Sequence, residues 1–206
     1  MEISLIVFVL MKRFIDILVS LVVLLLGLPF GLLIALLIVM DSRGHVIYKQ
    51  KRVGRNNVDF QLYKFRTMCN DADQGSLLTV GEHDARITRT GTFLRKYKID
   101  EFPQFLNVLK GEMSIVGPRP EVRRYVEMYT PEQMRVLTVR PGLTDYASIR
   151  YVNENALLAA SDNPEETYIH EIMPDKLALN LQYIDEQSIW VDIKVMVQTL
   201  VAIFKR

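Results

Sequence analysis

Residues 18–40 read LVSLVVLLLGLPFGLLIALLIVM, a stretch of 23 positions without one charged side chain. As a helix this stretch would be roughly 35 Å long, which is enough to cross the apolar core of a bilayer. The direct interpretation is therefore a transmembrane helix. Two features of the same region favour a different path, in which the chain enters the membrane, bends and returns to the side from which it came.

The first feature is basic charge on both flanks. Lys12 and Arg13 precede the stretch, and five more basic residues follow it: Arg43, Lys49, Lys51, Arg52 and Arg55. Because basic residues near membrane segments are retained on the cytoplasmic side, both ends are expected on that side.

The second feature is Pro29, close to the middle and flanked by Gly27 and Gly31. Proline removes a backbone hydrogen bond and collides with the carbonyl one turn earlier, so a kink is expected there. We predict that residues 1–41 form a lead-in and a re-entrant helix-break-helix kinked at Pro29. A kinked spanning helix is the alternative.

The length and composition of the whole chain indicate a single domain. The chain has 206 residues, of which 50% are apolar, and a net charge of +1, which gives no support for nucleic-acid binding. The single cysteine, Cys69, excludes an intrachain disulfide and is expected to be a packed or partly exposed thiol. Residues 42–206 are predicted to form one domain with the hairpin, on the cytoplasmic side that the flanking charges indicate.

Local patterns downstream predict an α-rich α+β domain with a few short strands. Two β-like runs, 46–48 and 60–65, are separated by a Gly-Arg-Asn-Asn turn. The remaining expectations are a surface loop at 70–84, helical structure late in 86–98, a helix at 100–110 stopped by Gly111, a short apolar run at 114–116 before the turn 117–120, and helical pieces at 121–129, 131–136 and 188–204.

The last of these helices carries apolar side chains and ends on a basic pair. Trp190, Val197, Phe204 and the closing Lys205-Arg206 suit an amphipathic helix at the membrane interface. A buried core helix is an equally good interpretation of the same residues.

Asp100 and Glu101 are the strongest candidates for chemistry. Adjacent carboxylates at a helix start lie near free backbone N–H groups, which favour their charged form. An ionised aspartate can attack phosphorus, and a neighbouring carboxylate can hold Mg²⁺. Ordinary helix capping is the alternative for the pair taken alone.

Basic residues are frequent on both sides of this pair. They are Lys64, Arg66, Arg86, Arg89, Arg95, Lys96 and Lys98 upstream, and Arg119, Arg123, Arg124 and Arg140 downstream. Arg119 lies between two prolines and Arg140 precedes Pro141-Gly142, so stiff turns hold both. Such a set could compensate the charge of a pyrophosphate, although contact with anionic lipid headgroups is an alternative for some members.

Several long motifs resemble the bacterial sugar transferases, the monotopic phosphoglycosyl transferases. The resemblance rests on stretches 84–95, 99–111 and 113–120, on Lys64-Phe-Arg-Thr-Met68, on Val139-Arg-Pro-Gly-Leu-Thr144, and on Lys12-Arg-Phe-Ile-Asp16 before the apolar segment. It extends from about residue 11 to the C-terminus. The resemblance implies a re-entrant membrane anchor, in agreement with the charge argument.

The resemblance also implies a reaction and roles for individual residues. Asp100 would attack the β-phosphate of a UDP-sugar, release UMP and hold the sugar phosphate covalently until polyprenyl (undecaprenyl) phosphate takes it. Glu101 corresponds to the position at Mg²⁺. Lys64, Arg95, Arg119 and Arg140 are assigned to phosphate and nucleotide contacts.

The chain departs from the family pattern at two places. Many relatives have a small hydroxyl residue before the proline, where this chain has Leu28. Many relatives continue Gly-Trp-Ala-Gln after Leu143-Thr144, whereas this chain has Asp145-Tyr146-Ala147-Ser148. We interpret the second departure, in the stretch 145–151, as evidence of a less common donor such as an amino- or acetamido-deoxy sugar.

The resemblance places the protein at the bacterial inner membrane, with its catalytic region on the cytoplasmic face. The expected partners are a UDP-sugar, polyprenyl phosphate, membrane lipids, downstream glycosyltransferases and a second copy of the chain, with no nucleic acid. The product would initiate a capsule, exopolysaccharide, O-antigen or glycoprotein glycan. A nucleotide-sugar hydrolase and an inactive scaffold of a glycan assembly complex remain the alternatives.

Overall fold

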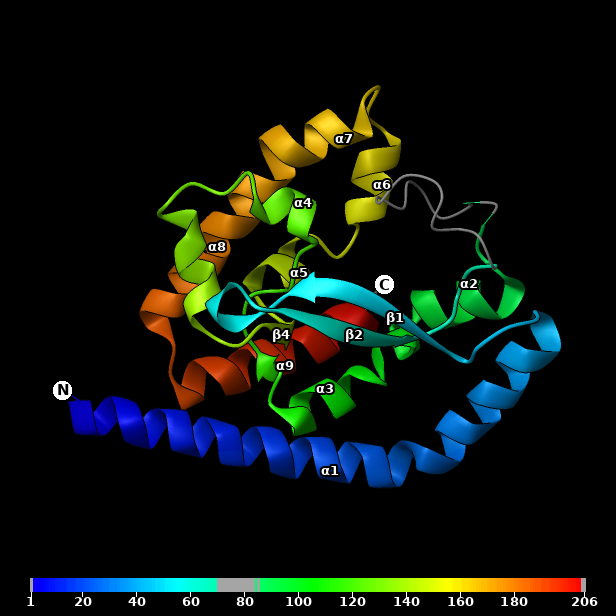
Figure 1. Ribbon diagram of the computed structural model, residues 1–206, viewed down its shortest axis with the longest axis horizontal. Coiled ribbons are helices and arrows are strands. Elements are labelled where there is room, and N and C mark those ends of the chain that lie inside the picture. Colours follow the sequence, from blue (N-terminus) through cyan, green and yellow to red (C-terminus); the bar gives the residue numbers. More distant parts are fainter. Residues whose placement is uncertain (1, 70–83, 85, 205–206) are drawn as a thin grey trace.

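The uncharged stretch lies within one long helix, α1 (Glu2–Asp41), which runs along the base of the molecule (Figure 1). The computed structural model describes residues 2–69, 84 and 86–204. The predicted loop at 70–84, apart from Asp84, and the closing Lys205-Arg206 lie outside the described residues. In the described part, α1 is the one helix long and apolar enough to cross a membrane, and only 6% of its most apolar 18 residues are buried. The predicted apolar N-terminal helix is confirmed.

Helix α1 bends in its second half, the half that contains Pro29 (Figure 1). The helix is continuous through Pro29, so the expected break is a bend. Proline removes one backbone hydrogen bond, which need not end a helix whose other backbone hydrogen bonds remain. Gly27 also serves packing. A Cβ at Gly27 would lie 2.4 Å from the ring of Phe102, so only glycine admits that ring against α1.

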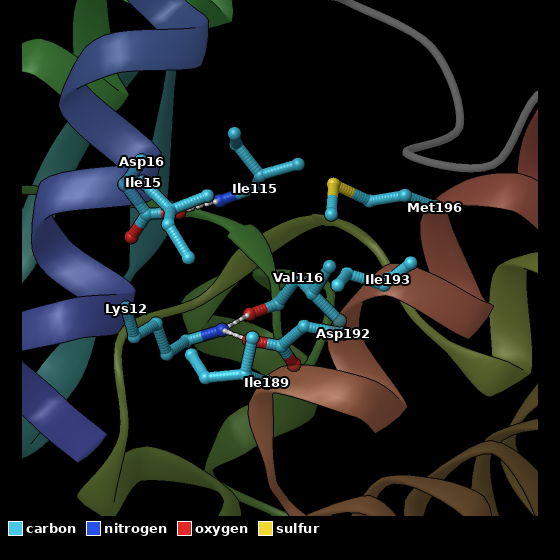
Figure 2. Close-up of a pocket in the computed structure, with 9 residues that line it drawn as sticks. All are labelled: Lys12, Ile15, Asp16, Ile115, Val116, Ile189, Asp192, Ile193 and Met196. Atoms are coloured by element: carbon cyan, nitrogen blue, oxygen red, sulfur yellow. Dashed lines mark hydrogen bonds and ion pairs between the residues drawn. The ribbon is translucent and has the colours of Figure 1, made fainter.

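The N-terminal half of α1 is tied to the domain by polar contacts. The Lys12 ammonium donates to the Val116 carbonyl at 2.9 Å and pairs with Asp192 (Figure 2). The Arg13 guanidinium donates to the carbonyls of Val108 and Leu109 at 2.7 and 2.9 Å. The basic pair before the apolar stretch is therefore a docking element.

The C-terminal end of α1 is tied to the same body. Buried Arg66 donates to the carbonyls of Ser42 and Arg43 at 2.6 and 2.7 Å. The Asp41 carboxylate accepts from the backbone N–H of Thr90 at 2.8 Å. Both ends of the apolar helix thus contact one domain.

The first sheet is an antiparallel hairpin of β1 (Ile47–Val53) and β2 (Asp59–Phe65). Its turn contains a short 3-10 segment, η1 (Arg55–Asn57), in which Asn56 and Asn57 have positive φ. Asparagine tolerates that conformation better than most residues, which explains the Asn-Asn pair. The two predicted strands and their turn are confirmed, with strands longer than predicted.

A second sheet pairs β3 (Ser114–Val116) with β4 (Gly142–Thr144) in parallel. Strand β4 was not predicted, because a strand of three residues that begins with the glycine of Pro141-Gly142 carries no alternating pattern. The pairing needs close backbone contact: a Cβ on Gly142 would lie 2.2 Å from the backbone nitrogen of Gly117. These strands place the turn that follows β3 beside the residues that follow β4.

The helix predicted at 100–110 is divided in two. Residues Ile99–Glu101 form a 3-10 turn, η3, and α3 covers Gln104–Lys110, with Pro103 at its N-cap. The turn starts after Lys98, which has a left-handed φ of 57°. Gly111, at φ 85°, ends α3 as predicted.

The remaining helices complete a helix-rich domain. They are α2 (Arg89–Lys96), α4 (Arg123–Val126), η4 (Gln133–Thr138), α5 (Tyr146–Arg150), α6 (Glu154–Ala159), α7 (Pro164–Thr167), the π-helical η5 (Tyr168–Ile172), α8 (Met173–Glu186) and α9 (Ile189–Phe204). Helices α4, α6, α7 and α8 lie on the side of the hairpin away from α1 (Figure 1). The prediction of one compact helix-rich domain with few short strands is confirmed, and α5 to α8 were not predicted.

Helix α9 combines the two interpretations of its sequence. Val195 is fully buried, whereas Trp190 is 80% exposed and Val197 is 54% exposed. One side of α9 therefore belongs to the core and the other is apolar and uncovered.

We expect Gly142→Ala to lower the free energy of unfolding by about 1–3 kcal/mol, the usual cost of overpacking. The added methyl would collide with the Gly117 backbone, which cannot move without separating β3 from β4. Thermal unfolding in detergent measures the effect. Gly31→Ala is the control, because a Cβ there meets Phe102 at an ordinary 3.5 Å. Equal stability of the two variants would contradict the prediction.

Candidate active site

Asp100 and Glu101 lie in η3, immediately before the residue that packs on α1. Asp100 is 6% exposed, and its Oδ1 has no hydrogen-bond partner among the described residues. A buried carboxylate oxygen normally has a partner, so this atom is available to a ligand.

Glu101 is held by cations. The Arg119 guanidinium donates to both carboxylate oxygens of Glu101, from Nη1 to Oε2 at 3.2 Å and from Nη2 to Oε1. The Lys64 ammonium lies 3.9 Å from Oε1. The bidentate geometry fixes the plane of the carboxylate.

The surroundings shift the pKa values of the two adjacent carboxyl groups in opposite directions. Burial raises the pKa of Asp100, and the neighbouring Glu101 charge adds to that rise. Burial opposes the charged form of Glu101 too, but Arg119, Lys98 and Lys64 outweigh it and hold the pKa of Glu101 well below its usual range. Glu101 is therefore a fixed anion, whereas for Asp100 the effect of burial exceeds that of the cations Lys64, Lys98 and Arg95.

Three predicted binding residues converge on this pair from separate elements. Lys64 comes from β2, Arg95 from the last turn of α2, and Arg119 from the turn after β3. Arg95 interacts electrostatically with both Asp100 and Glu101. The pair thus lies where the first sheet, α2 and the second sheet meet.

Arg140 lies elsewhere. Its Nε donates to the Gly111 carbonyl at 2.9 Å, at the end of α3, and its charged neighbours are Arg13, Arg55 and Asp16. The Arg140 side chain, held by the Pro-Gly turn that follows it, therefore contacts the C-terminal end of α3 and not the carboxylate pair.

Other members of the basic set form structural contacts. Arg66 caps α1, Arg86 pairs with Asp84, Arg123 with Asp59, and Arg124 with Glu165. Sequence proximity to the pair therefore did not distinguish structural cations from those of the site.

Sequence reasoning assigned no role in the site to three further residues: Lys98 stood only in the basic set, Asp145 only in the departing stretch 145–151, and Gln104 was not singled out. Lys98 acts electrostatically on both carboxylates. Gln104 is 1% exposed, and its Nε2 has no hydrogen-bond partner in the described part of the chain. Asp145 is fully buried and accepts from the backbone N–H of Arg119. The Lys98 and Gln104 positions lie in or beside the matching motif, which could have indicated them.

The residues fit a Mg²⁺ ion that is held mainly by its substrate. No group of three acidic, His or Cys residues suited to a metal occurs in the described residues. However, Mg²⁺ often uses one or two carboxylates, with water and phosphate oxygens as its other ligands. The unpartnered Asp100 Oδ1, next to the Glu101 carboxylate, meets that requirement.

We expect kcat/KM of the free enzyme to fall as the pH rises through about 8. Burial lowers the pKa of Lys64 to about 8, so its cation is present below that pH and is lost above it. Lys64→Arg should retain the charge and move the alkaline limb to higher pH, since kcat/KM reports groups of the free enzyme. Lys51→Arg, at an exposed lysine paired with Asp59, is the control. An unchanged limb in Lys64→Arg would exclude Lys64 as its source.

The apolar helix and the basic side chains around a buried carboxylate pair indicate a membrane-associated protein whose site suits anions. The sequence model of the family described as bacterial sugar transferase matches residues 7–206. The chain belongs to the bacterial sugar transferase family.

Curated relatives agree with this assignment. A UDP-N-acetylgalactosamine-undecaprenyl-phosphate N-acetylgalactosaminephosphotransferase of Aeromonas hydrophila is 36% identical over 197 residues, which are 94% of this chain and 44% of that protein. A UDP-glucose:undecaprenyl-phosphate glucose-1-phosphate transferase of Caulobacter vibrioides is 35% identical, over 92% of this chain and 68% of that protein. An exopolysaccharide production protein of Rhizobium leguminosarum is 37% identical, over 93% of this chain and 94% of that protein.

The chain spans less than half the length of some relatives that it matches, such as the Aeromonas protein. The names of these relatives include N-acetylgalactosamine and glucose donors, so the donor sugar of this chain stays a prediction.

Proposed function

We propose that this protein transfers a sugar-1-phosphate from a UDP-sugar to undecaprenyl phosphate and releases UMP. The observation that carries the proposal is the buried Asp100 carboxylate, whose Oδ1 has no hydrogen-bond partner in the described part of the chain, beside a Glu101 held by Arg119 and Lys64. The names of the Aeromonas and Caulobacter relatives, which act on undecaprenyl phosphate, support it.

The reaction has two displacements at one phosphorus. An Asp100 oxygen attacks the β-phosphorus of the UDP-sugar, the bond from that phosphorus to the bridging oxygen breaks, and UMP leaves with that oxygen. An oxygen of undecaprenyl phosphate then attacks the same phosphorus. The bond to Asp100 breaks, the carboxylate is regenerated, and the product is the undecaprenyl diphosphate sugar.

Burial and charge suit Asp100 to this role. A buried carboxylate whose Oδ1 has no hydrogen-bond partner among the described residues has no such bond to lose at that oxygen when it attacks phosphorus. Lys64, Arg95 and Arg119 orient the phosphates and offset their charge. If bound, Mg²⁺ held by Asp100 and Glu101 would supply further charge compensation for the diphosphate.

Helix α1 would bring the lipid acceptor to the same place. The ring of Phe102, which follows the carboxylate pair directly, packs on α1 at Gly27. A helix that lies in the cytoplasmic leaflet would therefore hold the site at the membrane surface, where the headgroup phosphate of the acceptor lies.

We further propose that α1 is re-entrant, with residues 42–206 in the cytoplasm of a bacterium as the catalytic region. Lys12 and Arg13 contact the domain at one end of the apolar stretch, and Arg66 contacts Ser42 at the other. A helix whose two ends bind one cytoplasmic body cannot cross to the opposite face. The apolar exposed side of α9, with Trp190, would lie at the interface.

We expect tags at the two termini to be accessible from the same, cytoplasmic, side. Reactivity of terminal cysteine tags toward an impermeant maleimide in intact and opened spheroplasts measures this. The natural Cys69, which is exposed, is replaced by serine beforehand. Labelling of one terminus in intact spheroplasts and protection of the other would establish a spanning helix and exclude the re-entrant one.

The transferase proposal is tested by release of UMP from a panel of UDP-sugars with Mg²⁺, with and without undecaprenyl phosphate. The panel includes UDP-N-acetylgalactosamine, UDP-glucose and UDP-galactose. We expect sustained UMP release only when the acceptor is present. Sustained release without it would establish a hydrolase, and no release with any donor would favour a scaffold.

A further inference from the structure

The carboxylate of Asp145 contacts the backbone of Arg119, the residue whose guanidinium holds Glu101. Asp145 is fully buried. Its Oδ2 accepts from the backbone N–H of Arg119 at 3.2 Å, and its Oδ1 accepts from the backbone N–H of Ser148 at 2.7 Å, which caps α5. One side chain thus joins the turn after β3 to the start of α5.

These contacts extend the pairing of the second sheet. The Gly117 N–H donates to the Thr144 carbonyl at 3.0 Å. Two residues after Gly117, the Arg119 N–H donates to the side chain of Asp145, the residue that follows Thr144. The Arg119 guanidinium also donates to the Leu143 carbonyl at 3.4 Å. The backbone and the side chain of Arg119 are therefore both anchored to the residues at and after β4.

The charges of Glu101 and Asp145 both stabilise the Arg119 cation, in addition to the hydrogen bonds that hold it. The Glu101 carboxylate is the main cause of the raised pKa of Arg119, and Asp145 contributes to it. Arg119 thus lies between a carboxylate that it orients and a carboxylate that orients it.

We propose that Asp145 is a positioning residue for the reaction, which acts through Arg119 on Glu101. This inference rests on the proposed sugar-phosphate transfer. The orientation of Arg119 therefore depends on a side chain that contacts no reacting group itself.

The chain offers a matched control at the other end of α5. The Asp175 carboxylate accepts from the Tyr151 hydroxyl at 2.7 Å and lies 3.2 Å from Nε of Arg150. Asp175→Asn therefore loosens α5 without removing a contact to Arg119. Asp145→Asn keeps an oxygen for Ser148, and asparagine is a good N-cap, but its amide group faces the Arg119 N–H with a donor.

The experiment measures kcat and KM for UMP release with undecaprenyl phosphate and the donor that the wild type uses. We expect Asp145→Asn to lower kcat/KM about 10-fold, the effect of losing one hydrogen bond of ordinary strength. Asp175→Asn should stay within about 2-fold, since it alters no contact of the site. In an Arg119→Lys background, Asp145→Asn should add less than about 2-fold, because residues that act in series are not additive.

Two further measurements keep the inference separate from folding and from the proposed function. Thermal unfolding identifies a misfolded variant, and Asp145→Ser, which also caps, then replaces Asp145→Asn. The side-chain ¹⁵N resonance of Arg119, assigned by its loss in Arg119→Lys, should shift in Asp145→Asn and keep its position in Asp175→Asn, where only the resonance of Arg150 is expected to move.

Wild-type activity in Asp145→Asn, an equal loss in Asp175→Asn, or a full multiplicative loss in the Arg119→Lys background would overturn the inference. Absence of UMP release by the wild type would refute the proposed function instead. In that case an unshifted Arg119 resonance in Asp145→Asn would overturn the inference. A shifted resonance would support the coupling between Asp145 and Arg119 on which the inference is built.

Discussion

Asp100→Asn should abolish sugar transfer, with kcat at least about 10⁴-fold below that of the wild type, as expected for loss of a covalent nucleophile. The amide of asparagine cannot form and release an acyl phosphate bond as a carboxylate can. The substitution keeps the shape of the side chain, so donor binding should persist. UMP release with undecaprenyl phosphate measures the loss.

The same variant should fold as well as the wild type. Burial already raises the pKa of Asp100, so the site disfavours its charge, and a neutral amide of equal size removes that cost. Asp185→Asn, at an exposed residue paired with Arg135, is the control for loss of one carboxylate and should retain full activity. Substantial turnover by folded Asp100→Asn would exclude the covalent route.

Arg119→Ala should lower kcat/KM by about 10²–10³-fold, the usual effect of removing one preorganised charged donor from a site. The substitution removes the bidentate partner of Glu101 and leaves Lys64, at 3.9 Å, as the nearest cation to that carboxylate. Steady-state kinetics of UMP release measure the effect. Arg135→Ala, which breaks an exposed ion pair with Asp185, is the matched control.

Stability should change in a pH-dependent way in Arg119→Ala. The lowered pKa of Glu101 contributes stability that is present above its unfolded pKa, near 4.5, and is lost as the pH falls through its folded pKa. The variant should therefore be less stable than the wild type at pH 7, and the difference should shrink below about pH 4. A difference in melting temperature that is constant from pH 7 to pH 3 would contradict this account of Glu101.

The elements that were predicted correctly have local causes. The length of the uncharged stretch sufficed for α1, alternating residues and an Asn-Asn turn for the hairpin, and Gly111 for the end of α3. The carboxylate pair was chosen as the candidate site from its basic surroundings and its motif, and its role stays a prediction. Each of these signals lies within a few dozen residues of sequence.

The elements that were missed depend on contacts between distant residues. Strand β4 is short and exists because glycines at 117 and 142 let two backbones touch. The division of the predicted helix at 100–110 has local causes instead: Lys98 has a left-handed backbone, and Pro103 caps α3. The direction in which a rigid turn aims its arginine is set by tertiary packing, which is why Arg119 reaches Glu101 and Arg140 reaches Gly111.

Covalent capture is the most direct test of the proposal that Asp100 carries the sugar phosphate. The purified protein is incubated with Mg²⁺ and a UDP-sugar labelled with ³²P at the β-phosphorus, without acceptor, and is then quenched in acid. We predict label on the peptide that contains Asp100, absent from Asp100→Asn and lost from the protein when undecaprenyl phosphate is added before the quench. Formation of labelled lipid by a protein that never acquires label would contradict the account.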